Sequence, residues 1–102
     1  MRDKVAMTKP KTQTHPWDVT RYLDSDAAIA AYLDAVLEED NPALLAAALG
    51  DVARAKGMTQ IAHETGLGRE SLYKALSFQG NPEFGTVQKV IRSLGLKLHV
   101  SA

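Results

Sequence analysis

With 102 residues, the chain is long enough for one domain with a core of its own, and its formal net charge is zero. It has no cysteine, which excludes disulfide frameworks and thiolate metal sites and is typical of a reducing compartment. No apolar run is long enough to span a bilayer, and the polar start lacks the apolar segment of a signal peptide. We therefore expect a soluble cytoplasmic protein.

The charges are unevenly distributed along the chain. Residues 16–50 carry seven Asp or Glu against one Arg, a net charge of −6, whereas residues 1–15 and residues 51–102 each stand at +3. The neutral total therefore hides an acidic first half and a mildly basic second half. Such an asymmetry bears on binding partners more than on the fold.

The N-terminal region differs from the rest of the chain. Residues 1–16 are polar, include two prolines and show no periodicity, so we expect a flexible arm before a single helical domain over residues 17–102. The segment WDVTRYL at 17–23 alternates weakly and fits either a short strand or an irregular lead-in.

Two longer helices are expected next. The first is capped by Ser25 or Asp26 and ends before Asp-Asn-Pro at 40–42, where the asparagine can cap a second helix and the proline fill its first position. Gly57 ends this second helix. Apolar residues at helical spacing mark the two buried faces: Ile29, Tyr32, Leu33 and Val36, then Leu45, Ala48, Leu49 and Val52.

Three further helices are expected after Gly57. Two short ones span residues 59–65 and 69–77. A loop follows, in which Phe84 packs over the last helix, and Thr86 caps that helix. Their inward residues are Ile61 and Ala62, then Leu72 and Leu76, and finally Val87, Val90, Ile91 and Leu94.

The end of the chain is β-prone. Gly95 stops the last helix, and LKLHV at 96–100 alternates, so its expected partner is the segment at 17–23. Together these elements predict an all-α domain of five helices with a small terminal two-stranded sheet.

Three residues have the spacing of a helix-turn-helix unit, A-x-x-x-G-x-x-x-x-x-L. Ala62 lets the two short helices approach, Gly66 allows the turn, and Leu72 anchors the second helix. The second helix of such a unit lies in the major groove of DNA with its first turn at the base edges. The same spacing also fits a plain helical hairpin with a solvated polar face.

The outward side of the second short helix carries residues suited to DNA and is expected to be cationic. Arg69 can bond bidentately to guanine, and Glu70 can accept from cytosine. Tyr73 can reach a phosphate or a thymine methyl group, and Lys74 a phosphate. The starts of the two helices and the following loop add candidates, chiefly for phosphate: Thr59, Gln60, Gly68, Gln79, Asn81 and Thr86.

Longer stretches are more specific than the spacing alone. They are GMTQIAHETGLGRESLYKALS, GNPEFGTVQKVIRSLGLKL and the preceding WDVTRYLDSDAAIAAYLDAVLEEDNPALLAAALGDVARAKG, which together cover residues 17–98. In them the chain resembles the addiction-module antidote proteins, HigA-type antitoxins with a Cro/λ-repressor-like helix-turn-helix. The resemblance implies a type II antitoxin that neutralises a RelE/ParE-superfamily toxin, typically an mRNA-cleaving ribonuclease, and represses its own operon as a homodimer.

The resemblance also implies roles for single residues. Gly68 departs from the family pattern, in which a Ser or Thr cap is usual; glycine caps almost as well as threonine but offers no side-chain oxygen. The residues to which the resemblance assigns DNA contact are Gln60, Arg69, Glu70, Ser71, Tyr73 and Lys74.

The acidic half is a candidate surface for the toxin. A toxin that binds RNA should be basic, so acids within residues 18–40 would complement it and speed the encounter. The same acids could instead only solvate an exposed helix face. The candidate toxin contacts are Trp17, Asp18, Arg21, Tyr22, Asp34, Glu38 and Glu39.

Other chemistry finds little support in the sequence. The three histidines lack zinc-ligand spacing, so we expect neither a metal nor another cofactor. Ser71, His63 and Asp51 could be named as a triad, but the sequence has no nucleophile elbow, and we expect no enzyme. Two alternatives to the antitoxin stay open: a stand-alone phage-type repressor and a protein-interaction module without DNA binding.

Overall fold

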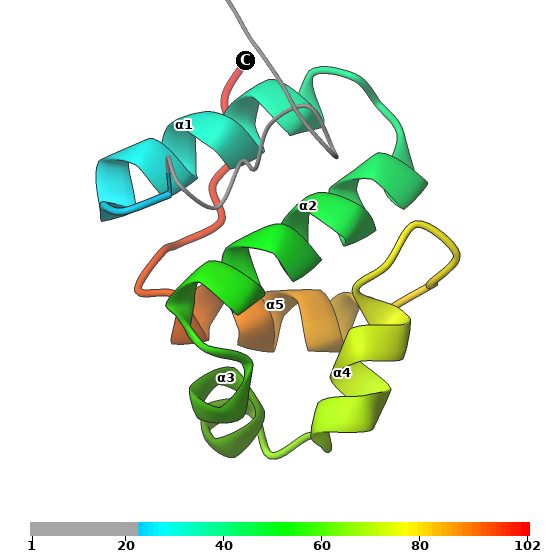
Figure 1. The fold of residues 1–102 in the computed structure, drawn as a ribbon. Coiled ribbons are helices and arrows are strands. Elements are labelled where there is room, and N and C mark those ends of the chain that lie inside the picture. The colour runs from blue at the N-terminus through cyan, green and yellow to red at the C-terminus, as the bar shows by residue number, and fades with distance from the viewer. Residues whose placement is uncertain (1–22) are drawn as a thin grey trace, which may run out of the picture.

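The computed structural model of the chain describes residues 23–102, which are all-helical as the sequence predicts (Figure 1). This part of the chain has no strand, and none of its helices is long and apolar enough to cross a membrane. Residues 1–22, with the expected arm and most of the 17–23 segment, lie outside it. The five helices are α1 (Asp26–Leu37), α2 (Pro42–Lys56), α3 (Met58–Thr65), α4 (Arg69–Ala75) and α5 (Phe84–Ser93).

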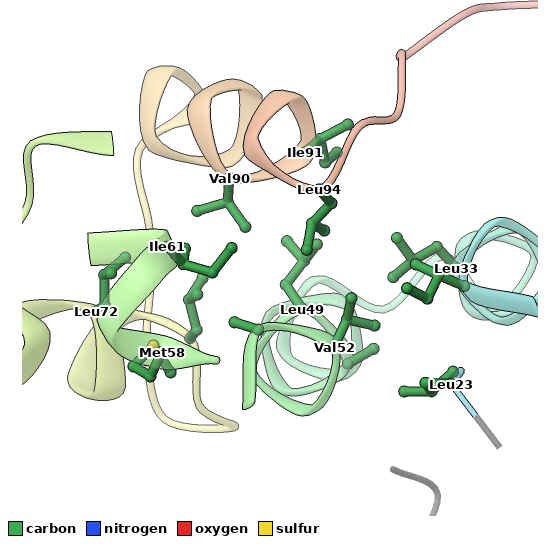
Figure 2. Packing of buried hydrophobic residues seen from close by; sticks show 14 of the residues in the cluster. Leu23, Leu33, Leu49, Val52, Met58, Ile61, Leu72, Val90, Ile91 and Leu94 are labelled. Atoms are coloured by element: carbon green, nitrogen blue, oxygen red, sulfur yellow. The ribbon is translucent and has the colours of Figure 1, made fainter. Parts of the chain in front are cut away.

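The helices surround one hydrophobic core. α1 and α2 run in opposite directions side by side at one end of the domain, whereas α3 and α4 lie at the other end (Figure 1). α5 packs against α3 and turns Val90 toward Ile61 of α3 and Leu94 toward Leu49 of α2, while Ile91 is buried beside Leu94 (Figure 2). The core therefore joins the α1–α2 end to the α3–α4 end and fixes their relative positions.

Side-chain caps set the starts of the first two helices. Ser25 accepts a hydrogen bond from the N–H of Ala28 at 3.1 Å, so the serine is the cap of α1. Asn41 accepts from the N–H of Leu44 at 3.2 Å, and Pro42 is the first residue of α2. The predicted caps of α1 and α2 are confirmed.

Tyr32 joins α1 to α2 through a polar contact at the edge of the core. Its hydroxyl donates to Asp51 at 3.0 Å, and Asp51 also pairs with Arg54 one turn later in α2. Burial, the negative charge of Asp51 and this hydrogen bond together raise the pKa of Tyr32 to about 12, while Arg54 lowers it in part. Asp51 is thus committed to a structural contact.

Two expectations about the start of α5 are wrong. The helix begins at Phe84 rather than after Thr86, because the carbonyl of Glu83 accepts from the N–H of Val87 at 3.0 Å and opens the helix without a side-chain cap. Phe84, expected to pack over the last helix, is instead 68% exposed. Thr86 lies half-buried inside the first turn.

The ends of α4 and of the chain also differ from expectation. α4 ends at Ala75 rather than at Ser77, because Leu76 leaves the helical conformation with φ −95° and ψ 57°. Residues 96–100 form no strand with any described residue, and this extended segment passes α1 (Figure 1). Its expected partner at 17–23 lies almost entirely outside the described residues.

Candidate nucleic-acid interface

The α3–α4 pair (Met58–Ala75) consists of two crossing helices and a short turn. α3 ends at Gly66, whose φ of 75° is the left-handed conformation that glycine favours, and its N–H donates to the carbonyl of Ala62 at 3.0 Å. α4 begins three residues later at Arg69, and Figure 1 shows α3 nearly end-on with α4 beside it, seen from the side. The predicted turn at Gly66 is confirmed.

Buried side chains hold this turn from inside. Ala62 and Leu72 are buried, as predicted. Thr65 is buried too, and its hydroxyl donates to the carbonyl of Ile61 at 2.8 Å and accepts from the N–H of Leu67 at 3.4 Å. Sequence reasoning missed Thr65; the available signal was a threonine directly before the turn glycine, where its hydroxyl can bond back to the helix.

Backbone contacts hold the far end of α4. A Cβ on Gly50 in α2 would fall on the carbonyl oxygen of Leu76, and one on Gly80 would fall on that of Ala75. Both glycines therefore allow an approach that no other residue permits. The sequence carried one signal of this: glycine inside a helix costs about 1 kcal/mol relative to alanine, so its presence in α2 calls for a packing reason.

The outward surface of the α3–α4 pair presents polar side chains. The guanidinium carbon of Arg69 lies 6.0 Å from the centre of the Tyr73 ring, a cation–π contact that orders both side chains. On α3, the side-chain amide of Gln60 donates to Glu64 at 3.0 Å. All eight residues predicted for DNA contact are exposed: Thr59, Gln60, Gly68, Arg69, Glu70, Ser71, Tyr73 and Lys74.

The exposed face of α4 alone carries two cations against one anion, but the surface of the α3–α4 pair as a whole is balanced in charge. Within the α3–α4 pair, the exposed Glu64 and Glu70 offset the exposed Arg69 and Lys74. The cationic character predicted for the outward side of α4 therefore does not extend to α3. DNA binding here would depend on directional hydrogen bonds and shape more than on neutralising phosphates.

The loop after α4 carries the other candidates for phosphate contact. Gln79 and Asn81 are exposed in this loop, whereas Thr86 is half-buried within α5. The first two are therefore free to meet a ligand beside α4, and the threonine is the less accessible of the three.

A comparison with known protein families identifies the family of the chain. A family model described as "Probable addiction module antidote protein" matches residues 13–102. The chain belongs to this antidote family. A protein of Haemophilus influenzae named only "Uncharacterized protein" is 50% identical over 88 residues, which span 86% of this chain and 91% of that protein. No solved structure matches the chain significantly.

Membership in the antidote family implies a cognate toxin as partner. The candidate surface for it lies at the α1–α2 corner, where α1 ends. Asp34 on α1 is exposed, as are Glu38, Glu39 and Asp40 in the turn that follows. These acids therefore gather at the opposite end of the domain from the α3–α4 pair (Figure 1). Four other predicted toxin contacts lie outside the described residues: Trp17, Asp18, Arg21 and Tyr22.

The catalytic alternative has no matching geometry in the described residues. Asp51 is hydrogen-bonded to Tyr32 and paired with Arg54, while His63 and Ser71 are exposed on different helices. Within residues 23–102, no three His, Asp or Glu side chains gather closely enough to hold a metal ion.

Proposed function

We propose that the chain is the antitoxin of a type II toxin–antitoxin system. It neutralises a small basic toxin of the RelE/ParE superfamily and represses its own operon by binding operator DNA. The observation that carries the antitoxin role is the match to the antidote family over residues 13–102. The exposed polar row on α4 supports the DNA-binding role.

In the proposed DNA complex, the α3–α4 pair acts as a helix-turn-helix of the λ-repressor type. α4 enters the major groove, with Arg69 toward a guanine and Glu70 toward a cytosine. Tyr73 lies one turn after Arg69 on α4, and its ring contacts the Arg69 guanidinium. This contact restricts the conformations of the arginine side chain before DNA is bound. Lys74 and the exposed start of α3 at Thr59 meet phosphates.

The toxin is proposed to bind at the α1–α2 corner. Four exposed carboxylates stand there, and described cations are absent from α1 and from the turn up to α2. A toxin that binds RNA carries a cationic surface, which this corner complements and attracts over a distance of about a Debye length. The acids thereby favour a rapid encounter with the toxin.

One observation favours a second candidate, a protein-interaction module that keeps the α3–α4 pair only as scaffold. The charges on that pair cancel, so the electrostatic attraction of a DNA-binding surface is weak. No observation favours the stand-alone repressor in this way, because the matching family is one of antidote proteins.

Co-expression tests the antitoxin role. The gene product encoded beside this chain should arrest growth when expressed alone, and the chain should restore growth and co-purify with it. Failure of both rescue and co-purification with each neighbouring product would contradict the proposal.

A salt-dependent gel shift on the DNA upstream of the operon tests the repressor role. Arg69→Ala should weaken specific binding by about 1–3 kcal/mol, roughly 5- to 150-fold, because one bidentate base contact is lost. Arg92→Ala is the matched control, since Arg92 is an exposed arginine at the end of α5 and its removal changes the net charge equally. Equal weakening by both variants, or no specific binding at all, would favour the scaffold alternative.

A further inference from the structure

An apolar groove runs between the α1–α2 corner and the start of α5. Its volume is about 310 Å³. Ala46 and Leu49 of α2 lie buried at its floor, while its rim consists of Leu37, Phe84 and Leu98, which are 47%, 68% and 45% exposed. Three large apolar side chains around one hollow form a patch of the kind that marks a protein contact rather than scattered surface residues.

The groove has no charge of its own. None of the residues that line it is Asp, Glu, Lys, Arg or His. A second copy of the same chain brings an identical surface, so any charge near a two-fold axis would face its own like charge. An uncharged patch avoids that repulsion, whereas a basic toxin gains nothing here and is better matched by the carboxylates of the neighbouring turn.

The exposed apolar area is large enough for the centre of a small dimer interface. Phe84 alone leaves on the order of 100 Å² of its ring surface in water, and the two rim leucines add to it. A stable interface buries about 800 Å² per partner, with its apolar anchors at the centre and a polar rim around them. Phe84 projects from the rim, so the ring from each copy can enter the hollow of the other.

The groove is rigidly linked to α4. The loop from 76 to 83 joins α4 to Phe84, and Gly80 in this loop sits directly on the carbonyl of Ala75 at the end of α4. Gly50 fixes the same end of α4 to α2, which forms the floor. A partner seated on the groove is therefore positioned relative to α4 without a flexible joint.

We propose that this groove is where two copies of the chain pair, with Phe84 as the central anchor. The pairing is isologous and brings the ends of the two α4 helices toward each other. Their first turns, which carry Arg69, point apart toward two half-sites about 34 Å from centre to centre. This role for the spacing rests on the proposed operator binding, while the dimer itself does not.

Sedimentation velocity of the full chain over a range of concentrations tests the pairing. The unaltered chain should dimerise, and Phe84→Glu should weaken the dimer by about 30-fold or more, as expected when a central aromatic anchor is lost. Leu98→Glu, also at the rim, should act in the same direction. Phe78→Glu is the matched control, because Phe78 is 56% exposed but does not line the groove, and it should leave the dimer intact. Far-ultraviolet circular dichroism confirms that each variant is folded.

Each result decides the proposal. A monomeric unaltered chain, or a Phe84→Glu variant that dimerises normally, would overturn it. If Phe84→Glu abolishes co-purification of the toxin but leaves the dimer intact, the groove is a toxin site and the proposal is also overturned. If the unaltered chain is monomeric and Phe84→Glu lowers its stability, a segment of the same chain covers the groove, and the proposal is again overturned. If the dimer is lost as expected but the unaltered chain never binds operator DNA, the pairing stands and the repressor role fails.

Discussion

At the scale of single residues, Gly50 determines how closely α2 can approach the end of α4. Its missing side chain leaves the space that the carbonyl of Leu76 occupies, and Gly80 does the same for the carbonyl of Ala75. Both contacts are made by backbone atoms, which cannot change rotamer to make room. The position of α4 is therefore sensitive to a single methyl group at either glycine.

Gly50→Ala is expected to destabilise the domain by about 1–3 kcal/mol, because the added methyl must displace a main-chain carbonyl in a packed region. The matched control is Gly85→Ala in α5, where a Cβ would meet nothing within 4 Å. That change should be neutral or stabilise by up to about 1 kcal/mol, since alanine favours helix. Urea unfolding of both variants measures the difference. Equal stabilities would show that α4 yields more easily than its contacts indicate.

Tyr32 makes stability depend on pH at high pH. Its pKa is raised from 10.0 to about 12 in the folded chain, so the folded state keeps its proton where the unfolded state has lost it. The contribution is fully present below pH 10 and is lost as the pH rises through about 12. Unfolding free energy should therefore fall over this window, and Tyr32→Phe should make the fall shallower. An unchanged slope in the variant would contradict the role of the Asp51 contact.

At the scale of elements, the sequence predicted the helices well where their ends depend on local side chains. Ser25, Asn41 and Pro42 start α1 and α2, and Gly66 ends α3, each through contacts within a few residues. The start of α5 depends on the backbone of Glu83 instead, so Thr86 was a misleading signal. A suitable capping residue therefore does not mark the start of a helix when a backbone hydrogen bond has already started the helix at an earlier residue.

The candidate site was predictable in part for the same reason. The exposed row on α4 follows from helical periodicity around Leu72, which needs only local sequence. The contacts of Gly50 and Gly80 with α4, and the exposure of Phe84, join segments far apart in the chain. The positive charge of the α4 face was also predictable from local sequence, whereas its balance by Glu64 depends on the neighbouring helix.

Gly68 gives a test of how α4 begins. The residue has φ −70° and ψ 146°, an extended conformation that serine adopts easily, and a Cβ there would lie 3.9 Å from the Ser71 hydroxyl. Gly68→Ser should stabilise the domain by a few tenths of a kcal/mol, because its hydroxyl can accept from a free N–H of the first turn, whereas Gly68→Ala should cost about 0.5 kcal/mol, because alanine is a poorer cap than glycine. Thermal unfolding compares them, and a gel shift shows whether the serine also tightens operator binding through a phosphate. Equal stability of the two variants would exclude capping at this position.

At the scale of the whole molecule, the two proposed binding surfaces lie at opposite ends of one rigid core. The acids occupy the α1–α2 corner, and the α3–α4 pair occupies the far end (Figure 1). A toxin at the first surface leaves the second uncovered. The proposed antitoxin can therefore hold the toxin and the operator at the same time.

Charge reversal separates a toxin surface from a merely solvated helix end. Glu38→Lys with Glu39→Lys should slow toxin association by about 10- to 100-fold at low salt, because the steering field is inverted. The control pair, Glu64→Lys with Glu70→Lys, changes the net charge equally and lies in the α3–α4 pair, away from the corner. Stopped-flow association at increasing salt should show the difference between the pairs shrinking. Identical rates for both pairs would leave the corner acids without a part in toxin binding.

The balanced charge of the α3–α4 pair has a consequence for how the proposed repressor would behave in a cell. Each phosphate neutralised adds a step of salt-dependent affinity for any DNA, whatever its sequence. With Arg69 and Lys74 offset by Glu64 and Glu70, this general affinity is small. The chromosome would then sequester few copies, and most would stay free in solution to find the operator. Occupancy of the operator would then follow the total amount of antitoxin, with or without bound toxin, so transcription would respond to the level of its own product.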